Sequence, residues 1–515
     1  MRRNIFVLVG ALCFLALSSW GEEITGKPLD PVMKMELIRL DELWNVLDQC
    51  AARVWPGWTG YADVPFLFDY ENGVRMLVGH PEPPPGFELV QGVEVRGKKV
   101  YLNRQSEVPV KLTWPTGGGG GPQSFGTHDG KDVETVWIQL SSTSPPKESK
   151  PEDKFQWSSE NQILLYVHEL FHVFQGSFYT FAHGNLQYNP DTNYAAYSEI
   201  EGEALKQAFL AKESSVAKEY LKDFIAARKL KYKSMAPIEQ AQEKEEDFME
   251  GTARYSEYAV LQQISAKYQP KISQMDDPYF FGFKDLKSFF DQRLQELDGS
   301  KGMTLESLQK CYQYGCFQAL LLSRFSPGWQ KSIPAKYHYL SDIISDFLGM
   351  KKNEELKVEE RLSAKYNAKA LFAKHDAVVK ARDNAFKSFF AQKGKVYVIN
   401  FKPTGEFPIP GPEAAAKVYR RGLQTVYPEG VKAISIKEVL YEGKGKPVAT
   451  DQIYYLRYVD TQGQKYSITS SKKEGDVYTN AVITTSGFTL KAPKIQVKER
   501  GNRVKFVVVS KVKQN

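Results

Sequence analysis

Two histidines four residues apart, with a glutamate directly after the first, stand in the apolar stretch NQILLYVHELFHVFQG. In a helix, residues at i and i+4 project from the same side, so His168 and His172 can place their ring nitrogens around one ion. Glu169 is turned by about 100° from His168, so its carboxylate can reach a metal-bound water but not the metal. The pattern predicts a zinc site with Glu169 as the general base.

The residues around this motif predict a capped amphipathic helix. Ser159 followed by Gln162 fits a capping box, and Ser158 is the alternative cap. The expected buried stripe consists of Ile163, Leu164, Val167, Phe171 and Phe174. A strand is expected at 133–142, ahead of the helix. This context favours a metal site over the competing interpretation, a structural pair of core histidines.

A catalytic zinc needs three protein ligands and one open position. Positions 175 and 178 are Gln and Phe, so no third histidine follows at the spacing found in HExxHxxGxxH proteins. We therefore expect a glutamate from a later helix. Two stretches compete: EEDFMEGTARYSEY offers Glu250, and SEIEGEALKQAF offers Glu199, Glu201 and Glu203.

HExxH followed downstream by EGTARY resembles the gluzincin-type zinc metallopeptidases of the peptidase MA clan. Glu250 opens a stretch that matches the EGxAxY pattern of this family position for position, whereas the stretch from Glu201 matches only the first half. The resemblance implies that His168, His172 and Glu250 bind one Zn2+ per chain. Many gluzincins orient a histidine with an aspartate where this chain has Arg254, so we expect Glu201 to be the orienting acid.

Further motifs resemble those of a group of exported bacterial HExxH proteins. They are WPGW at Trp55–Trp58, PFLF, the His80-Pro81 pair, HELFHVFQ, IEGEAL, EGTARY and YGCFQALLLSRFSPGW. The resemblance covers roughly residues 40–330 and does not extend to the C-terminal region.

The function implied is an exported zinc-dependent hydrolase, a metallopeptidase acting on a peptide or protein substrate. Glu169 would take a proton from water and pass it to the leaving amine. Tyr255 is our candidate for stabilising the oxyanion, with Tyr258, Tyr179 and His183 as alternatives. Two other functions stay open: a zincin-fold metal-binding protein without efficient catalysis, and an envelope interaction protein acting through its β domain.

The first residues predict export. Arg2 and Arg3 precede an apolar run too short to span a bilayer, which is typical of a cleaved signal peptide over residues 1–21. We expect a periplasmic or extracellular protein without a transmembrane segment in the mature chain. No Lys/Arg-rich segment with interleaved aromatic residues is present, so a nucleic-acid partner is not expected. The remaining cysteines, Cys50, Cys311 and Cys316, are expected as buried thiols.

The predicted class is α+β, with a zincin-like, mainly helical metallopeptidase domain at 22–392. Its N-terminal sheet part covers about 22–145 and its helical part about 155–392. Asn72-Gly73 predicts a hairpin turn, and the five glycines at 117–121 predict a mobile loop. Short β-rich runs separated by turns predict an all-β accessory domain of sandwich or barrel type at 393–515.

Overall fold

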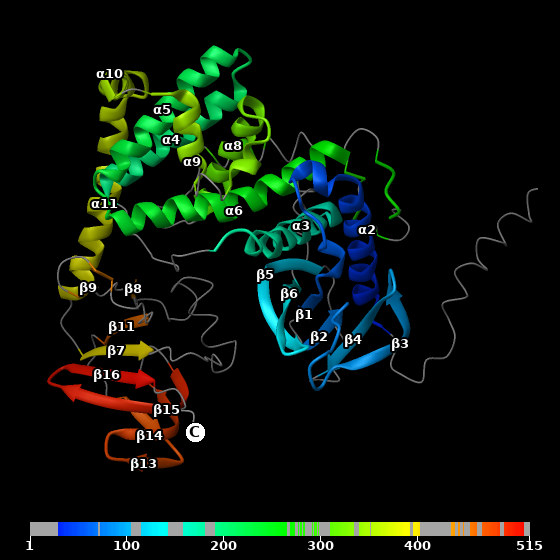
Figure 1. The fold of residues 1–515 in the computed structure, drawn as a ribbon. Coiled ribbons are helices and arrows are strands. Elements are labelled where there is room, and N and C mark those ends of the chain that lie inside the picture. Colours follow the sequence, from blue (N-terminus) through cyan, green and yellow to red (C-terminus); the bar gives the residue numbers. More distant parts are fainter. Residues whose placement is uncertain are drawn as a thin grey trace, which may run out of the picture. The chain divides into compact units, whose positions relative to one another are not determined.

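Figure 1 shows the computed structural model of the chain. It describes residues 29–70, 73–104, 115–142, 158–180, 191–264, 309–333, 339–350, 352–391, 395–401, 454–460, 466–484 and 489–508, with shorter pieces within 268–297 and 434–447. The described residues divide into two compact units, one drawn from Met1–Gly184 and Tyr197–Tyr366 and the other from Asn185–Ala196 and Asn367–Asn515. The predicted signal peptide lies outside the described residues.

The first unit contains a six-stranded mixed sheet in the order β3-β4-β2-β1-β6-β5. β1 and β6 run parallel, and the other neighbouring pairs are antiparallel. The predicted hairpin is confirmed, because Phe66 of β1 pairs with Val78 of β2, although Asn72 itself lies outside the described residues. The strands are β1 (Phe66–Tyr70), β2 (Val74–Val78), β3 (Glu88–Val95), β4 (Lys98–Arg104), β5 (Pro115–His128) and β6 (Lys131–Ser142).

The glycine run forms part of strand β5. Gly120 pairs with Ile138 of β6 and Gly121 pairs with Trp137, and a register shift between Gly117 and Gly119 bulges the strand. The expectation of a mobile loop is therefore wrong. Glycine disfavours a strand through its backbone entropy, but here the ladder to the buried strand β6 offsets that cost. β5 is one of the two edge strands of the sheet.

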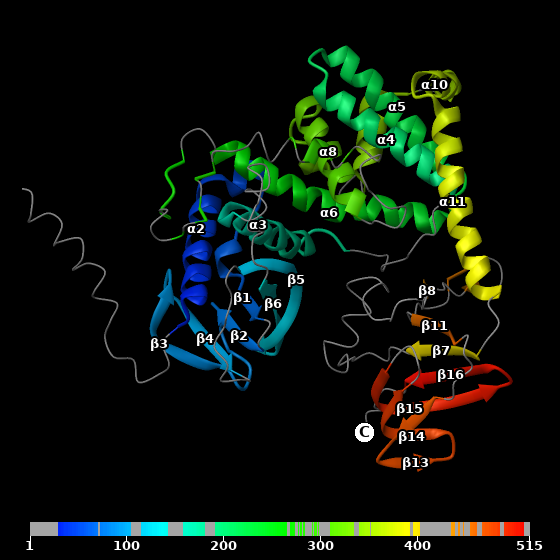
Figure 2. The ribbon, with the colours of Figure 1, turned by 180° about the vertical axis from the view of Figure 1, so that it is seen from behind.

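Helix α3, which contains HELFH, lies between the sheet and the long helix α6 in both views of the fold (Figures 1 and 2). The motif therefore lies on a helix that contacts both the sheet and α6. The helices of this unit are α2 (Pro31–Val54), α3 (Ser159–Gly176), α4 (Thr192–Leu210), α5 (Ser214–Tyr232), α6 (Pro237–Ile264), α8 (Gln309–Phe325), α9 (Leu340–Leu348) and α10 (Lys352–Lys365), with short 3-10 helices η2 (Tyr61–Asp63) and η5 (Trp329–Ser332).

A buried ion network fixes the start of α3. Ser158 caps the helix by accepting a hydrogen bond from the backbone N–H of Asn161 at 3.1 Å, so the alternative cap is the one used. Ser159 instead donates to Asp277 and accepts from Arg39 at 2.9 Å. Arg39 of α2 also donates to Asp277 at 3.1 Å. Because a buried charge without its partner is costly, this network fixes α3 against α2.

The WPGW motif packs against the apolar side of α3. The rings of Trp55 and Trp58 contact Phe171 in edge-on arrangements, with ring centroids 5.0 and 5.1 Å away. The predicted stripe is confirmed as buried, apart from Phe174, which is half-buried. The apolar side of α3 is thus occupied by packing, which leaves another side for His168 and His172.

The second unit contains α11 (Ala368–Ala391) and an eight-stranded sheet in the order β12-β14-β15-β16-β7-β11-β8, with β13 paired to β14. Its strand pairs are antiparallel except β16 with β7. The α+β class is confirmed, while the sandwich or barrel stays a prediction. The strands are β7 (Lys395–Phe401), β8 (Ile434–Lys437), β11 (Tyr454–Asp460), β12 (Ser467–Thr469), β13 (Lys472–Glu474), β14 (Val477–Thr484), β15 (Thr489–Arg500) and β16 (Arg503–Val508), with β9 (Tyr441–Glu442) and β10 (Lys446–Pro447) in a separate pair.

Cys50, Cys311 and Cys316 are buried thiols, as predicted, and they form no disulfide in the part of the chain that the structure describes. Burial raises the pKa of the Cys50 thiol to about 12, so it is protonated at neutral pH. Among the helices that the structure describes, none is long and apolar enough to cross a membrane.

Candidate metal centre

His168, His172 and Glu250 bring three possible ligand atoms together, two from α3 and one from α6. The Nε2 atoms of His168 and His172 lie 3.0 Å apart. Glu250 Oε2 lies 3.2 Å from His168 Nε2 and 3.4 Å from His172 Nε2. The structure thus juxtaposes the three residues that the sequence analysis named as ligands.

The spacing and the chemistry of these atoms fit a zinc ion. Ligands about 2.0–2.1 Å from a tetrahedral ion lie about 3.4 Å from one another, which is close to the three separations observed. Two imidazoles and one carboxylate form a ligand set of catalytic zinc sites, which keep the fourth position open. Glu250 retains 14% exposure and His172 9%, so the site is nearly enclosed.

Glu257 of α6 orients the first histidine. Its Oε1 lies 2.7 Å from Nδ1 of His168, and its Oε2 accepts a hydrogen bond from Arg254 at 2.7 Å. A carboxylate that accepts the Nδ1 proton leaves Nε2 unprotonated and aimed at the ion. Arg254 thus supports the acid that orients His168.

Gln175 orients the second histidine. Its amide nitrogen donates to the carbonyl of Met249 at 3.0 Å and to the hydroxyl of Thr252 at 2.6 Å, both on α6. A carbonyl can only accept, so these contacts fix which amide atom faces the histidine. The amide oxygen of Gln175 lies 2.7 Å from Nδ1 of His172, which must therefore donate. His172 Nε2 is then free to bind a metal.

Glu201 does not orient either histidine, and that expectation is wrong. The side chain lies in a fully buried ion cluster among the helices, where it accepts from Arg228 at 3.1 Å and pairs with Lys231. Lys231 also pairs with Glu243 of α6. Two cations therefore hold Glu201 in the helical core, and the second glutamate-rich stretch contributes no ligand.

Glu169 lies beside the ligands, against the glycine run of β5. It is 6% exposed. Burial raises the pKa of its carboxyl, and the positive charge of the nearby histidines opposes this shift. A Cβ built on Gly120 would lie 3.0 Å from both Cγ and Oε1 of Glu169. The strand can approach Glu169 this closely because position 120 has no side chain.

Carboxylates dominate the electrostatics of the histidine pair. Burial alone would lower the pKa of His168, but hydrogen bonds with Glu250 and Glu257 raise it to about 9. The same histidines hold the pKa of Glu250 well below its usual range, against the effect of burial. These groups therefore favour a cation between them, and a proton on His168 competes with a metal ion.

Tyr255 does not lie at the centre, so its proposed role is not supported by the geometry. Its hydroxyl accepts from Ser323 at 3.0 Å, and its ring packs edge-on against Trp55 and Trp329. Tyr255 is five residues after Glu250, which turns it by about 140° around α6. Of the alternatives, Tyr179 packs on Phe248, and His183 lies outside the described residues.

Tyr312 of α8 is the tyrosine at the centre. Its ring stacks on His168 with centroids 5.7 Å apart, and the Arg254 guanidinium lies 5.4 Å from the same ring centroid. Burial raises the pKa of the Tyr312 hydroxyl, and the hydrogen bond that it makes with Glu250 raises it further. Tyr312 therefore stays protonated and places a hydroxyl donor next to the carboxylate of Glu250.

Two glycines allow α8 to approach α6 at this level. A Cβ on Gly251 would lie 2.2 Å from the Cα of Gly315, and a Cβ on Gly315 would lie 1.8 Å from the carbonyl oxygen of Asp247. Gly251 directly follows Glu250, and Tyr312 precedes Gly315 by one helical turn. The close crossing therefore places Tyr312 beside Glu250.

Comparison with protein-family models, curated proteins and solved structures found no match to this chain.

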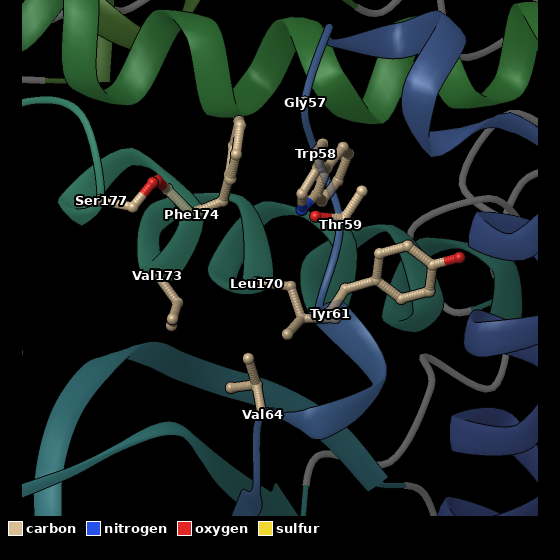
Figure 3. Close-up of a pocket in the computed structure, with 9 residues that line it drawn as sticks. All are labelled: Gly57, Trp58, Thr59, Tyr61, Val64, Leu170, Val173, Phe174 and Ser177. Carbon is tan, nitrogen blue, oxygen red and sulfur yellow. The ribbon is translucent and has the colours of Figure 1, made fainter.

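A pocket of about 340 Å³ lies beside α3 (Figure 3). Leu170, Val173 and Phe174 line it from the side of α3 roughly opposite His168. The remaining lining residues are Gly57, Trp58, Thr59, Tyr61, Val64 and Ser177. None of them is a ligand or orients one, so this pocket is separate from the candidate metal centre.

The sequence did not predict the roles of Glu257, Gln175 and Tyr312 or the contact made by Gly120. Glu257 had a usable signal, because seven residues are almost two full turns and place it on the same stripe of α6 as Glu250. Gln175 had a weaker one, three residues after His172. Tyr312 and Gly120 had none, since they reach the centre from separate elements of the fold.

Proposed function

We propose that this protein is a zinc-dependent hydrolase, a gluzincin-like metallopeptidase that cleaves peptide bonds. The observation that carries the proposal is the convergence of His168, His172 and Glu250 within 3.4 Å of one another, with the buried carboxylate of Glu169 beside them. The presence of Glu169, which can act as a general base, favours catalysis over simple metal binding. Glu257 and Gln175 support the same assignment, because each sets the histidine it contacts for metal binding.

A zinc ion held by these three residues would supply a Lewis acid that acidifies water and polarises a carbonyl oxygen. Glu169 accepts the proton of the attacking water and delivers it to the leaving amine nitrogen. Its raised pKa suits both steps, since the protonated form must persist long enough to act as an acid. Tyr312, and not Tyr255, provides the hydroxyl available for developing negative charge.

The position of β5 supports a peptide as the substrate. It is one of the two edge strands of the sheet, and none of the described residues pairs with its outer edge. Such an edge can bind an extended peptide through main-chain hydrogen bonds. Because Gly120 of β5 lies against Glu169, a peptide on this edge would pass close to the general base.

The test combines metal analysis with three variants of the purified protein and a peptide library. We expect one zinc per chain in the native protein and in Glu169→Gln, with cleavage reduced about 10²–10⁴-fold in this variant. Glu250→Gln should lose zinc, because it removes a ligand. Glu203→Gln, a partly exposed glutamate on α4, is the matched control and should keep both properties.

Two results would contradict the proposal. The first is the absence of stoichiometric metal from native protein purified without chelators. The second is full cleavage by Glu169→Gln, which would mean that the observed hydrolysis does not use this carboxylate.

A further inference from the structure

The net charge of the chain is concentrated at its C-terminal end. The full sequence has 68 basic and 61 acidic residues, a formal charge of +7. Residues 491–515 alone contain eight basic residues and one acidic residue, which is also a net +7. The preceding part of the chain is therefore neutral overall. The eight basic residues are Lys491, Lys494, Lys498, Arg500, Arg503, Lys505, Lys511 and Lys513.

The β15–β16 hairpin places four of these residues on one face of the C-terminal sheet. Lys498 lies directly opposite Lys505, and Arg500 lies directly opposite Arg503. The alternate positions Ile495, Val497, Val504 and Phe506 are buried. Because side chains alternate between the two faces of a strand, the four cations share the outward face next to the hairpin turn. We call this group of four residues the basic face.

The basic face is energetically unfavourable for the isolated fold. Like charges directly opposite each other on neighbouring strands repel and destabilise the pairing. Among the described residues, none of the four basic side chains forms an ion pair with an acid. The one acid of the hairpin, Glu499, pairs in register with the buried Val504 and so belongs to the other face. An anionic partner would relieve this repulsion.

We propose that the basic face is the contact surface for an anionic lipid bilayer. A sheet face offers its charges in a plane, which matches an extended layer of headgroups better than a single small anion. The outward positions Lys494, Gln496 and the four cations include no aromatic side chain, so the stacking that single-stranded nucleic acids require is missing. This proposal does not depend on the metal centre.

The test measures co-sedimentation of the purified protein with lipid vesicles. One set contains phosphatidylcholine alone, and the other contains about 30% phosphatidylglycerol, which supplies the negative surface charge. We expect binding to the second set only. Raising the salt from about 0.1 M to about 1 M should abolish binding, because the screening length falls from about 10 Å to about 3 Å.

Two double variants locate the contact. Lys498→Gln with Lys505→Gln, and separately Arg500→Gln with Arg503→Gln, should each lower the partition coefficient at least about tenfold, since each cation near an anionic surface contributes about fivefold. The matched control is Lys212→Gln with Lys331→Gln, two exposed lysines of the first unit. It changes the net charge equally and should bind as the native protein does.

Thermal melting distinguishes a variant that no longer contacts the bilayer from a variant that has unfolded. Both hairpin variants relieve repulsion between strands, so their melting temperatures should equal or exceed that of the native protein. Equal binding to both vesicle sets would overturn the proposal, and so would equal binding by the hairpin variants and the control. Hairpin-dependent retention on heparin or single-stranded DNA, without vesicle binding at the same salt, would overturn it in favour of a soluble polyanion.

Discussion

The carboxylate of Glu257 lies 2.7 Å from Nδ1 of His168, although the two residues are 89 positions apart in the sequence. Glu257 follows Glu250 by seven residues on the same helix. One helix therefore carries both a candidate metal ligand and the acid that orients another ligand. Rotation or translation of α6 would change both contacts together.

Replacing this acid should weaken metal binding without removing a ligand. In Glu257→Gln, the neutral amide is a poorer acceptor for the Nδ1 proton of His168, and Arg254 loses its ion-pair partner. We expect the zinc affinity to fall about 10–100-fold, measured by competition with a chromophoric chelator. Glu203→Gln serves as the control. An unchanged affinity would show that Glu257 is only a structural group.

The contact between β5 and the general base can be tested with two neighbouring glycines. In Gly120→Ala, the added Cβ would lie 3.0 Å from Cγ and Oε1 of Glu169, so one of the two must move. We expect cleavage to fall by about tenfold or more, because misplacement of a catalytic group by about 1 Å is costly, with zinc content unchanged. Gly121→Ala meets no atom within 4 Å and should keep its activity. Equal effects at both positions would contradict the contact.

The crossing of α6 and α8 predicts a large loss of stability. In Gly251→Ala, the new Cβ would lie 2.2 Å from the Cα of Gly315, so the helices must separate. Overpacking of this kind costs about 3 kcal/mol or more when backbone atoms must move, which urea unfolding can measure. The control is Gly176→Ala, at the last residue of α3, where an added Cβ meets no atom within 4 Å. This variant should stabilise the folded protein by about 0.5–1 kcal/mol. Similar values for the two variants would rule out the close crossing.

The pKa of His168 predicts a pH-dependent stability for the chelator-treated protein. Folding raises this pKa from 6.5 to about 9, so the stabilisation is fully present below about pH 6.5 and is lost as the pH rises through about 9. The loss should be on the order of 3 kcal/mol. Urea unfolding over this range measures it, and His168→Gln should remove the dependence. In the presence of zinc the trend should reverse, because fewer protons compete for the ligands.

Local spacing predicted the part of the site that lies on single helices. The four-residue interval between His168 and His172 required only helical geometry, and the same geometry would have found Glu257 if it had been applied to α6. The same geometry argues against the assignment of Tyr255, because five residues turn it by about 140° from Glu250, toward Trp55. Periodicity also predicted the buried stripe of α3 and the hairpin of β1 and β2.

The features that could not be predicted from the sequence depend on how separate helices and strands pack against one another. Tyr312 reaches the site because Gly251 and Gly315 let two helices touch. The glycine run becomes a strand because β6 pairs with it, which outweighs its weak intrinsic preference. Glu201 is held elsewhere by Arg228 and Lys231, whose burial depends on how α4, α5 and α6 pack. Apart from β6, which follows β5 after two residues, these partners lie far from one another in the sequence.

The separation of the ligands along the chain has a consequence for the order of assembly. His168 and Glu250 are 82 residues apart, so the complete ligand set exists only after α6 has docked on α3. A chain that has not reached this stage offers two histidines, which bind zinc far more weakly than three ligands do. Under the proposed function, the metal would be acquired late in folding, and hydrolytic activity would appear only once the helical region of a newly made chain is complete.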